Sequence, residues 1–204
     1  AMRELAKVNL SGKAAPYALP DAINDMRFRA YELFASAAKL GDVESQCKVG
    51  SLIDDRKIKT KTKKEANMEA INWYEKALSV QPKSGAENWC QANSANRLGE
   101  IYEKGNYVSK NYRVAHNWYL RATESGQKEA LFNLGSIYER GLGVARNYET
   151  ALIFYSMASK RGHSRARKYI KRVSKKLDVA KIESAKSSAF TCRRNRYIKC
   201  IQPI

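Results

Sequence analysis

No apolar run in this 204-residue sequence is long enough to cross a membrane, since a membrane-spanning helix needs about 20 consecutive apolar residues. Histidine is scarce, with only His116 and His163, and no cysteine pair has CxxC spacing, so we predict no metal site and no other cofactor. Catalysis needs a nucleophile with a base or a metal, so these few candidates predict a protein that is not an enzyme and has no small-molecule substrate, with an enzyme as the remote alternative. His116 lies at a position that is apolar elsewhere, which favours half-buried packing, and His163 is expected to be solvated at the start of a helix.

Cysteine is also sparse, because four cysteines are too few to form a disulfide framework for a chain of this length. We expect Cys47 and Cys90 to be separate thiols in the core. Cys192 and Cys200 would lie about 12 Å apart along a continuous helix, too far for a disulfide unless the chain turns back, so their pairing is left open.

Positive charge is abundant and unevenly distributed, with a formal net charge of +18. Residues 160–204 carry 15 Lys and Arg against two acids, whereas residues 1–159 carry 23 basic and 18 acidic side chains. A second basic run, Arg56–Lys64, is expected to be a solvated loop. The C-terminal end should therefore attract something anionic.

One stretch of the sequence occurs twice. Residues 98–126 and 134–162 are identical at 13 of 29 positions, which indicates an internal repeat of 36 residues. A third, weaker copy lies upstream, where Val49 and Gly50 match the repeated Leu-Gly and "AINWYEKA" matches "AHNWYLRA". The copies differ mainly by two insertions, "DDRKIKTKTKK" and "QPKSGAENW", both at places where turns are expected.

Each copy predicts two helices, because apolar residues recur at helical spacing from Ala130 to Tyr138 and again from Ala151 to Ala158. Gly141 and Gly143 are expected to end the first helix, and Gly135, inside it, to let the partner helix approach closely. A single hairpin cannot bury both of its faces, so the copies must stack. The sequence therefore predicts an all-α array of helix hairpins.

The shared pattern is Ala-x3-Leu-Gly-x2-Tyr-x2-Gly-x-Gly-Val followed by Asn-Tyr-x3-Ala-x2-aromatic-Tyr-x2-Ala-x3-Gly, and it resembles the Sel-one-like repeat, a relative of the tetratricopeptide repeat. The resemblance covers about Ile23 to Lys176, with Ile53 in place of the family tyrosine in the first copy. It implies a right-handed α-solenoid of about three helix hairpins, with a flanking N-terminal helix and a C-terminal capping helix. It also implies a non-catalytic adaptor or scaffold that binds a protein or peptide, of the kind common in bacteria as regulators, secreted effectors and toxin-neutralising immunity proteins.

The predicted organisation has four parts. Residues 1–22 form a partly irregular N-terminal arm, residues 23–162 the solenoid with long loops near 54–64 and 81–89, residues 163–186 a basic capping helix, and residues 187–204 a basic tail. Apolar residues from Ala166 to Ala180, at spacings of 4, 3, 4 and 3, predict that His163 to about Ala185 is one long helix.

In tetratricopeptide-like arrays the first helix of each pair lines the concave face, and the resemblance places the candidate partner-binding residues there. These groove residues are Glu44, Asp54, Asn93, Asn96, Glu100, Glu103, Glu129, Phe132, Ser136, Glu139 and Arg140, with Cys47, Ser51, Asp55 and Lys104 at equivalent positions. The same positions in the terminal helix form a candidate patch for an anionic partner, namely Arg165, Lys168, Arg172, Lys175 and Lys176. We predict a groove that is acidic along the repeats and basic at its C-terminal end, with partner contacts around Phe132 and the asparagines. The alternative is that these are ordinary solvated helix faces.

The basic end leaves the class of partner open, since an acidic protein, an anionic membrane lipid or RNA would each be attracted to it. RNA ranks lowest, because no recognised nucleic-acid motif accompanies the charge and Tyr169 is the one aromatic residue in the predicted terminal helix. We expect a monomer. A cytoplasmic location is favoured, and export stays open because a signal could have preceded residue 1.

Overall fold

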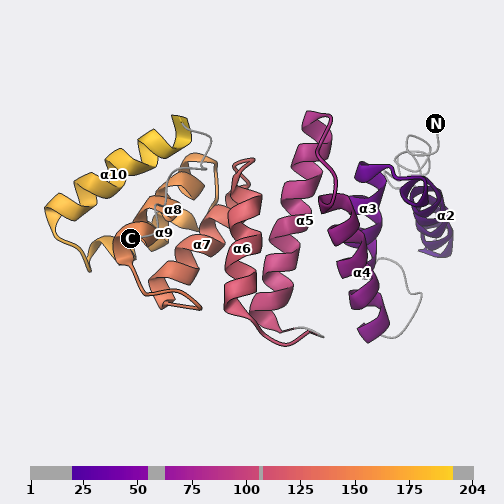
Figure 1. The fold of residues 1–204 in the computed structure, drawn as a ribbon, viewed down its shortest axis with the longest axis horizontal. Coiled ribbons are helices and arrows are strands. Elements are labelled where there is room, and N and C mark those ends of the chain that lie inside the picture. Colours follow the sequence, from indigo (N-terminus) through magenta and orange to yellow (C-terminus); the bar gives the residue numbers. More distant parts are fainter. Residues whose placement is uncertain (1–19, 55–62, 106–107, 195–204) are drawn as a thin grey trace. The chain divides into compact units, whose positions relative to one another are not determined.

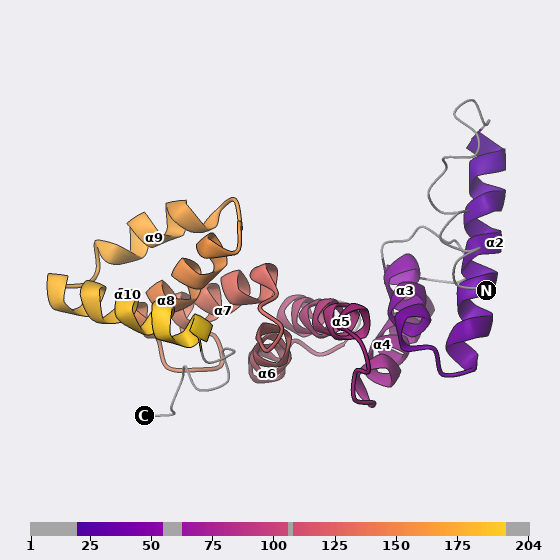
Figure 2. The ribbon, with the colours of Figure 1, turned by 90° about the horizontal axis from the view of Figure 1, so that it is seen from above.

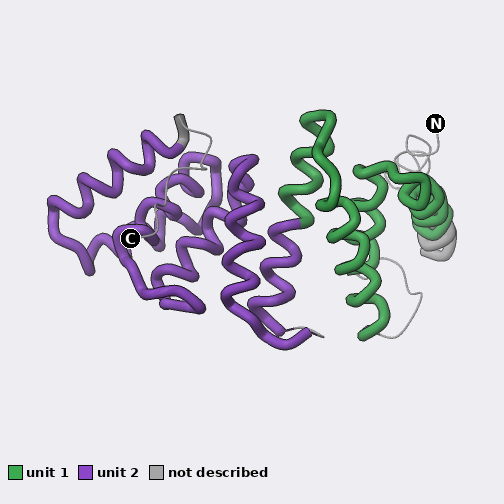
Figure 3. The backbone as a smooth tube through the Cα atoms, in the orientation of Figure 1, with its two compact units in different colours: residues 1–94 green, residues 95–204 purple. Residues whose placement is uncertain are grey.

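The computed structural model describes residues 20–54, 63–105 and 108–194, and all regular secondary structure in these ranges is α-helical (Figure 1). This confirms the all-α class. The chain forms two compact units, residues 1–94 and residues 95–204, whose boundary falls within helix α5, Gly85–Lys104 (Figure 3).

Unit 1 contains α2 (Pro20–Lys39), α3 (Val43–Asp54), α4 (Lys63–Leu78) and the N-terminal half of α5. Helix α3 packs against both α2 and α4 (Figures 1 and 2). Proline suits the first turn of α2 because a helix leaves the N–H groups of that turn unpaired. The helix thus begins three residues before the predicted start of the solenoid. Most of the loop predicted near 54–64 lies outside the described residues.

Unit 2 contains the rest of α5, then α6 (Tyr112–Thr123), α7 (Lys128–Arg140), α8 (Tyr148–Lys160), α9 (Ala166–Ser174) and α10 (Val179–Arg194). Helix α7 packs against α6 and α8, and α8 also contacts α9 and α10. The repeated asparagines cap the second helices: the Asn111 side chain accepts backbone N–H groups at the start of α6, and Asn147 does the same for α8. Gly141, with φ of 67°, ends α7 in the left-handed conformation, as the sequence predicts.

Within each repeat, a glycine of the first helix lies against a tyrosine ring of the second. A Cβ atom added at Gly50, Gly99 or Gly135 would lie 2.7, 2.5 or 2.6 Å from the ring of Tyr74, Tyr119 or Tyr155 respectively. All three tyrosines are fully buried. The predicted close approach of helices at Gly135 is confirmed, and the same contact explains Leu-Gly and Val-Gly in the other copies.

Helix α5 begins earlier than predicted, so the loop placed near 81–89 ends at Ser84. The Ser84 hydroxyl accepts the N–H of Glu87 at 3.1 Å, and the Glu87 carboxylate accepts the N–H of Lys83. This arrangement resembles the capping box that the letters Ser-x-x-Glu favour. Gly85 to Trp89 therefore extend the helix, and Pro82 remains in the preceding turn.

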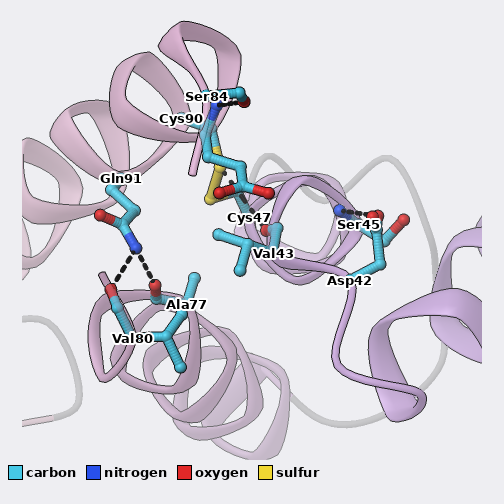
Figure 4. Close-up of a disulfide and its surroundings, with 10 residues drawn as sticks. Asp42, Val43, Ser45, Cys47, Ala77, Val80, Ser84, Cys90 and Gln91 are labelled. Carbon is cyan, nitrogen blue, oxygen red and sulfur yellow. Dashed lines mark hydrogen bonds between the residues drawn. A yellow bond between two sulfur atoms is a disulfide. The ribbon is translucent and has the colours of Figure 1, made fainter. Parts of the chain in front are cut away.

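The expectation that Cys47 and Cys90 are separate thiols is wrong, because they form a disulfide between α3 and the extension of α5 (Figure 4). Both cysteines are buried beside Val43 and Ala77. Gln91, next to Cys90, donates its side-chain amide to the carbonyls of Ala77 and Val80 at 2.5 and 2.8 Å. The start of α5 is thus fixed to α3 by the disulfide, and to the C-terminal end of α4 and the turn after it by Gln91. Cys192 is also disulfide-bonded, and Cys200 lies outside the described residues.

The prediction of one long capping helix over 163–185 is wrong, since the chain turns between α9 and α10. The Asp178 side chain accepts the N–H of Lys181 at 2.8 Å, which is the geometry of a helix N-cap. Helix α10 then packs against α8 and buries Ala185 and Ala189. The end of the array is therefore a further pair of helices. The first eight residues of the predicted tail, 187–194, belong to α10, and the remainder lies outside the described residues.

Candidate functional site

The first helix of each repeat carries an acid four residues after the glycine, and this acid accepts a hydrogen bond from the buried tyrosine. The hydroxyl of Tyr119 donates to Glu103 and that of Tyr155 to Glu139, both at 2.7 Å, and Tyr74 donates to Asp54 at 3.2 Å. Burial, with the adjacent carboxylate, raises the pKa of Tyr119 and Tyr155 well above the ordinary value, so both remain hydrogen-bond donors. Three of the predicted groove acids thus hold their own hairpins together.

Two of these acids in unit 2 also pair with an arginine of the next first helix. Glu103 lies 3.7 Å from Arg140 of α7, and Glu139 forms a hydrogen-bonded ion pair with Arg172 of α9. The Glu139 side chain is only 11% exposed, and its hydrogen bond raises the pKa of Arg172. These contacts join α5 to α7 and α7 to α9 along one side.

The other acids of that side in unit 2 also have cationic neighbours. Glu100 pairs with Arg97 at 3.0 Å and Lys104 at 3.6 Å, and Glu129 lies 3.8 Å from Lys128. In unit 1, Glu44, Asn93 and Ser51 are half-buried, and Asp55 lies outside the described residues. The expectation of a strongly acidic surface along α5 and α7 is therefore weakened by local pairing.

Phe132 is not open to a partner, because its side chain is only 5% exposed. The ring of His163 stacks on it at 4.1 Å, Tyr169 meets it edge-on at 4.8 Å, and the Arg165 guanidinium lies 4.9 Å from its centre. This also corrects the expectation that His163 is solvated, since it is buried and its Nδ1 has no hydrogen-bond partner among the described residues.

Asn96 is likewise buried, and its side chain already forms hydrogen bonds within the protein. Its amide donates to Glu100 at 3.0 Å, and its carbonyl accepts from Asn133 of α7 at 3.1 Å. Asn133 was missed by the sequence analysis, because its repeat position holds Arg97 and Lys48 in the other copies and gave no signal of an internal contact. The predicted partner contacts at Phe132 and Asn96 are therefore internal contacts, whereas Ser136 is half-buried and Arg140 is exposed.

Helix α9 presents a different surface, because most of its cations have no counter-charge. Arg165 and Arg172 lie against Phe132 and Tyr169. Five other cations are exposed and form no ion pair with any carboxylate in the described ranges, and we call them the α9 patch: Arg167, Lys168, Lys171, Lys175 and Lys176. Arg167 and Lys171 were missed because they fall outside the repeat's groove positions, although both are visible in the basic run of the sequence.

The described residues include neither a metal-binding cluster nor a membrane-length helix. No three His, Cys, Asp or Glu side chains among them could hold a metal ion together, and no described helix is long and apolar enough to span a bilayer. His116 is half-buried, as its repeat position predicts, and its Nε2 lies 3.0 Å from the Tyr138 hydroxyl.

The environment of His163 predicts a pH-dependent stability of unit 2. Burial first, and then Arg165 and Lys128, lower its pKa against the opposing effect of Glu129. As pH falls, the unfolded chain therefore protonates His163 before the folded chain does. The stabilising contribution of neutral His163 to folding is fully present above the unfolded pKa of about 6.5, and it is lost as pH falls through the folded pKa. We expect the wild type to lose more melting temperature than His163→Phe between pH 7.5 and 5, because phenylalanine keeps the stack without a titrating group. An equal loss of melting temperature in the two proteins would show that protonation of His163 does not destabilise unit 2.

Comparison with known proteins agrees with the repeat geometry. The Sel1 repeat family model matches residues 24–42, 62–79, 92–127 and 128–163. A Sel1 repeat protein from Oxalobacter formigenes has a similar structure, with a TM-score of 0.55 and 26% identity over 68% of this chain and 95% of that one.

A protective antigen of uropathogenic Escherichia coli with an SLR fold matches all of this chain with a TM-score of 0.51 and 20% identity. This chain spans about half of that protein, 49% of its length, so the likeness concerns the fold alone. No curated protein matches the sequence. The family is in general one of protein–protein interaction scaffolds. With four matched segments over more than half of its length, and a glycine–tyrosine contact in each of three hairpins, the chain belongs to the Sel1 repeat family.

Proposed function

We propose that the protein is a non-catalytic scaffold that binds a partner protein on the first-helix face of unit 2. This face is the side of α5, α7 and α9 that bears Glu100, Glu103, Glu129, Ser136, Glu139, Arg140, Arg165, Lys168 and Arg172. Partner binding is the property on which the roles of regulator, effector and immunity protein all depend. Glu44, Asp54 and Asn93 are the corresponding residues of unit 1 and remain part of the proposal.

One observation carries the proposal: side-chain contacts join successive first helices into a fixed surface. Glu103 links α5 to α7, and Glu139 links α7 to α9, while the tyrosines that donate to these acids are buried. A surface held in this way loses little conformational entropy when a partner binds, and preorganisation of this kind favours affinity. The aromatic side chains are used for packing, so charged and polar groups are what the face offers.

Site-specific photo-crosslinking in cells of the source organism tests this proposal. A benzophenone amino acid is placed at Arg140, which is exposed on the face, and at Asn117, which is exposed on second helix α6. We expect one defined polypeptide, identified by mass spectrometry, to be crosslinked from Arg140 and not from Asn117. The absence of an adduct at Arg140, or the same adduct from both positions, would contradict the proposal.

A further inference from the structure

Helix α9 and its C-cap residue Lys175 carry their cations on one face, because at about 100° per residue Arg167, Lys168, Lys171, Arg172 and Lys175 fall within about 140° of the circumference. Only Ala166 and Val173 are buried among its nine residues, and Arg167, Lys171 and Lys175 follow one another at intervals of four residues. Side chains at this spacing lie in a row along a helix. From Arg167 to Lys175 the row is about 12 Å long, which an extended peptide of about four residues matches.

Neighbouring acids do not neutralise this row of cations, because each of these acids already forms an ion pair with another side chain. Glu139 is bound by Arg172 and Tyr155, and in α10 and its cap Asp178 and Glu183 pair with Lys181 and Lys186. The α9 patch therefore keeps its positive potential, in contrast to the acids of α5 and α7. Like charges held close together repel, so an anionic partner relieves an unfavourable interaction as well as forming new ones.

The patch also has a rigid base. The Arg172 guanidinium lies 4.2 Å from the centre of the Tyr169 ring, and Tyr169 packs against Phe132 and Tyr155 at 4.8 and 5.2 Å. These contacts, with the Glu139 ion pair, fix α9 on α7 and α8. The exposed lysines thus extend from a supported helix.

We propose that the α9 patch binds an acidic segment of a partner protein, a short extended run rich in Asp and Glu. This inference rests on the proposed scaffold function and names the chemistry of the partner. An Arg-rich and Lys-rich surface steers such a segment by long-range attraction, and carboxylates then form charge-assisted hydrogen bonds with the cations.

RNA and membrane lipid fit the patch less well. Single-stranded RNA needs open aromatic faces on which bases stack, and here Phe132 is buried while Tyr169 is flanked by Arg172, Phe132 and Tyr155. A surface helix on a membrane inserts apolar side chains, and α9 exposes no large apolar residue. Both would bind through charge alone.

The test measures binding of a fluorescein-labelled octapeptide of alternating Glu and Asp to the oxidised 204-residue protein by fluorescence anisotropy. The patch variant is Lys168→Glu, Lys171→Glu and Lys175→Glu combined. The matched control, Lys39→Glu, Lys64→Glu and Lys83→Glu combined, changes net charge equally at exposed positions of unit 1. We expect the patch variant to lose about tenfold or more in affinity and the control to lose about threefold or less at 150 mM salt.

Competition and a milder variant make the outcome decisive. Uridine homopolymer RNA and phosphatidylserine vesicles should displace the peptide only at low salt, since they would bind by charge alone. The combined Lys→Gln variant at the same three positions should show an intermediate loss, and circular dichroism reports folding of each variant. Equal losses in the patch and control variants, or tighter binding of RNA or vesicles at 150 mM salt, would overturn the inference. If crosslinking at Arg140 persists in that case, the scaffold function stands and only the acidic partner is excluded.

Discussion

Loss of the Cys47–Cys90 disulfide is expected to lower the free energy of unfolding of unit 1 by about 4 kcal/mol. The bond joins cysteines 43 residues apart, and closing a loop of that length removes about this much conformational freedom from the unfolded chain. The bond also stabilises the folded state directly, because Gly85 to Trp89 bury little surface that would otherwise hold them in place. Without the bond, the cap at Ser84 and the Gln91 hydrogen bonds still hold the start of α5.

Denaturant unfolding of the Cys47→Ser, Cys90→Ser double variant and of the wild type measures this effect. Trp73 and Trp89 report on unit 1 by fluorescence, after Trp118 of unit 2 is replaced by phenylalanine in both proteins. The control, Cys192→Ser, leaves the Cys47–Cys90 bond intact and should not move the unfolding transition of unit 1. A midpoint in the double variant equal to that of the wild type would show that the bond adds nothing to unit 1. Disulfides persist in oxidising compartments, so the stability of unit 1 depends on where the chain resides.

Gly135→Ala is expected to destabilise unit 2 by about 1–3 kcal/mol, although alanine ordinarily favours a helix over glycine. The new Cβ would lie 2.6 Å from the Tyr155 ring. The ring cannot shift freely, because its hydroxyl is bound to Glu139 and its faces meet Phe132 and Tyr169. Gly99→Ala should destabilise unit 2 in the same way, because its added Cβ would lie 2.5 Å from the Tyr119 ring.

Gly85→Ala provides the matched control, since this glycine begins α5 and nothing lies within 4 Å of its added Cβ. Its effect on the urea midpoint should be neutral or slightly stabilising. If Gly135→Ala and Gly85→Ala shift the midpoint alike, the close glycine–tyrosine contact has no energetic weight.

The repeat pattern predicted the helices of unit 2 well because it reports directly on packing. Gly135 and Tyr155 recur together since one fills the space that the other leaves, and Asn147 recurs since α8 needs a cap. Such contacts lie within one repeat, so they are visible in the spacing of the sequence.

Contacts that each occur once were harder to predict. The bond between Cys47 and Cys90 joins distant residues that no spacing rule connects, and the turn at Asp178 competes with an apolar spacing that fits one continuous helix. The turn had a weak local signal in the aspartate before α10, and the early start of α5 had one in Ser84-x-x-Glu87, but no local signal indicated the disulfide.

The groove residues were the least predictable part, because charge alone does not show whether a side chain is available. Glu103 and Glu139 are acids in the sequence and tyrosine acceptors in the structure, and Phe132 is covered by His163. Replacing these acids is therefore expected to cost stability. Lys168 and Lys171, by contrast, face no described carboxylate.

Amide hydrogen exchange of the oxidised 204-residue protein, with and without a saturating concentration of the acidic octapeptide, tests the central claim most directly. Short surface helices open locally and exchange measurably, so a bound ligand slows them. The account predicts slower exchange in α9 and in the C-terminal turn of α7, with α2, α3 and α4 unchanged. Slowing confined to unit 1, or no slowing in α9 while the peptide is bound, would contradict it.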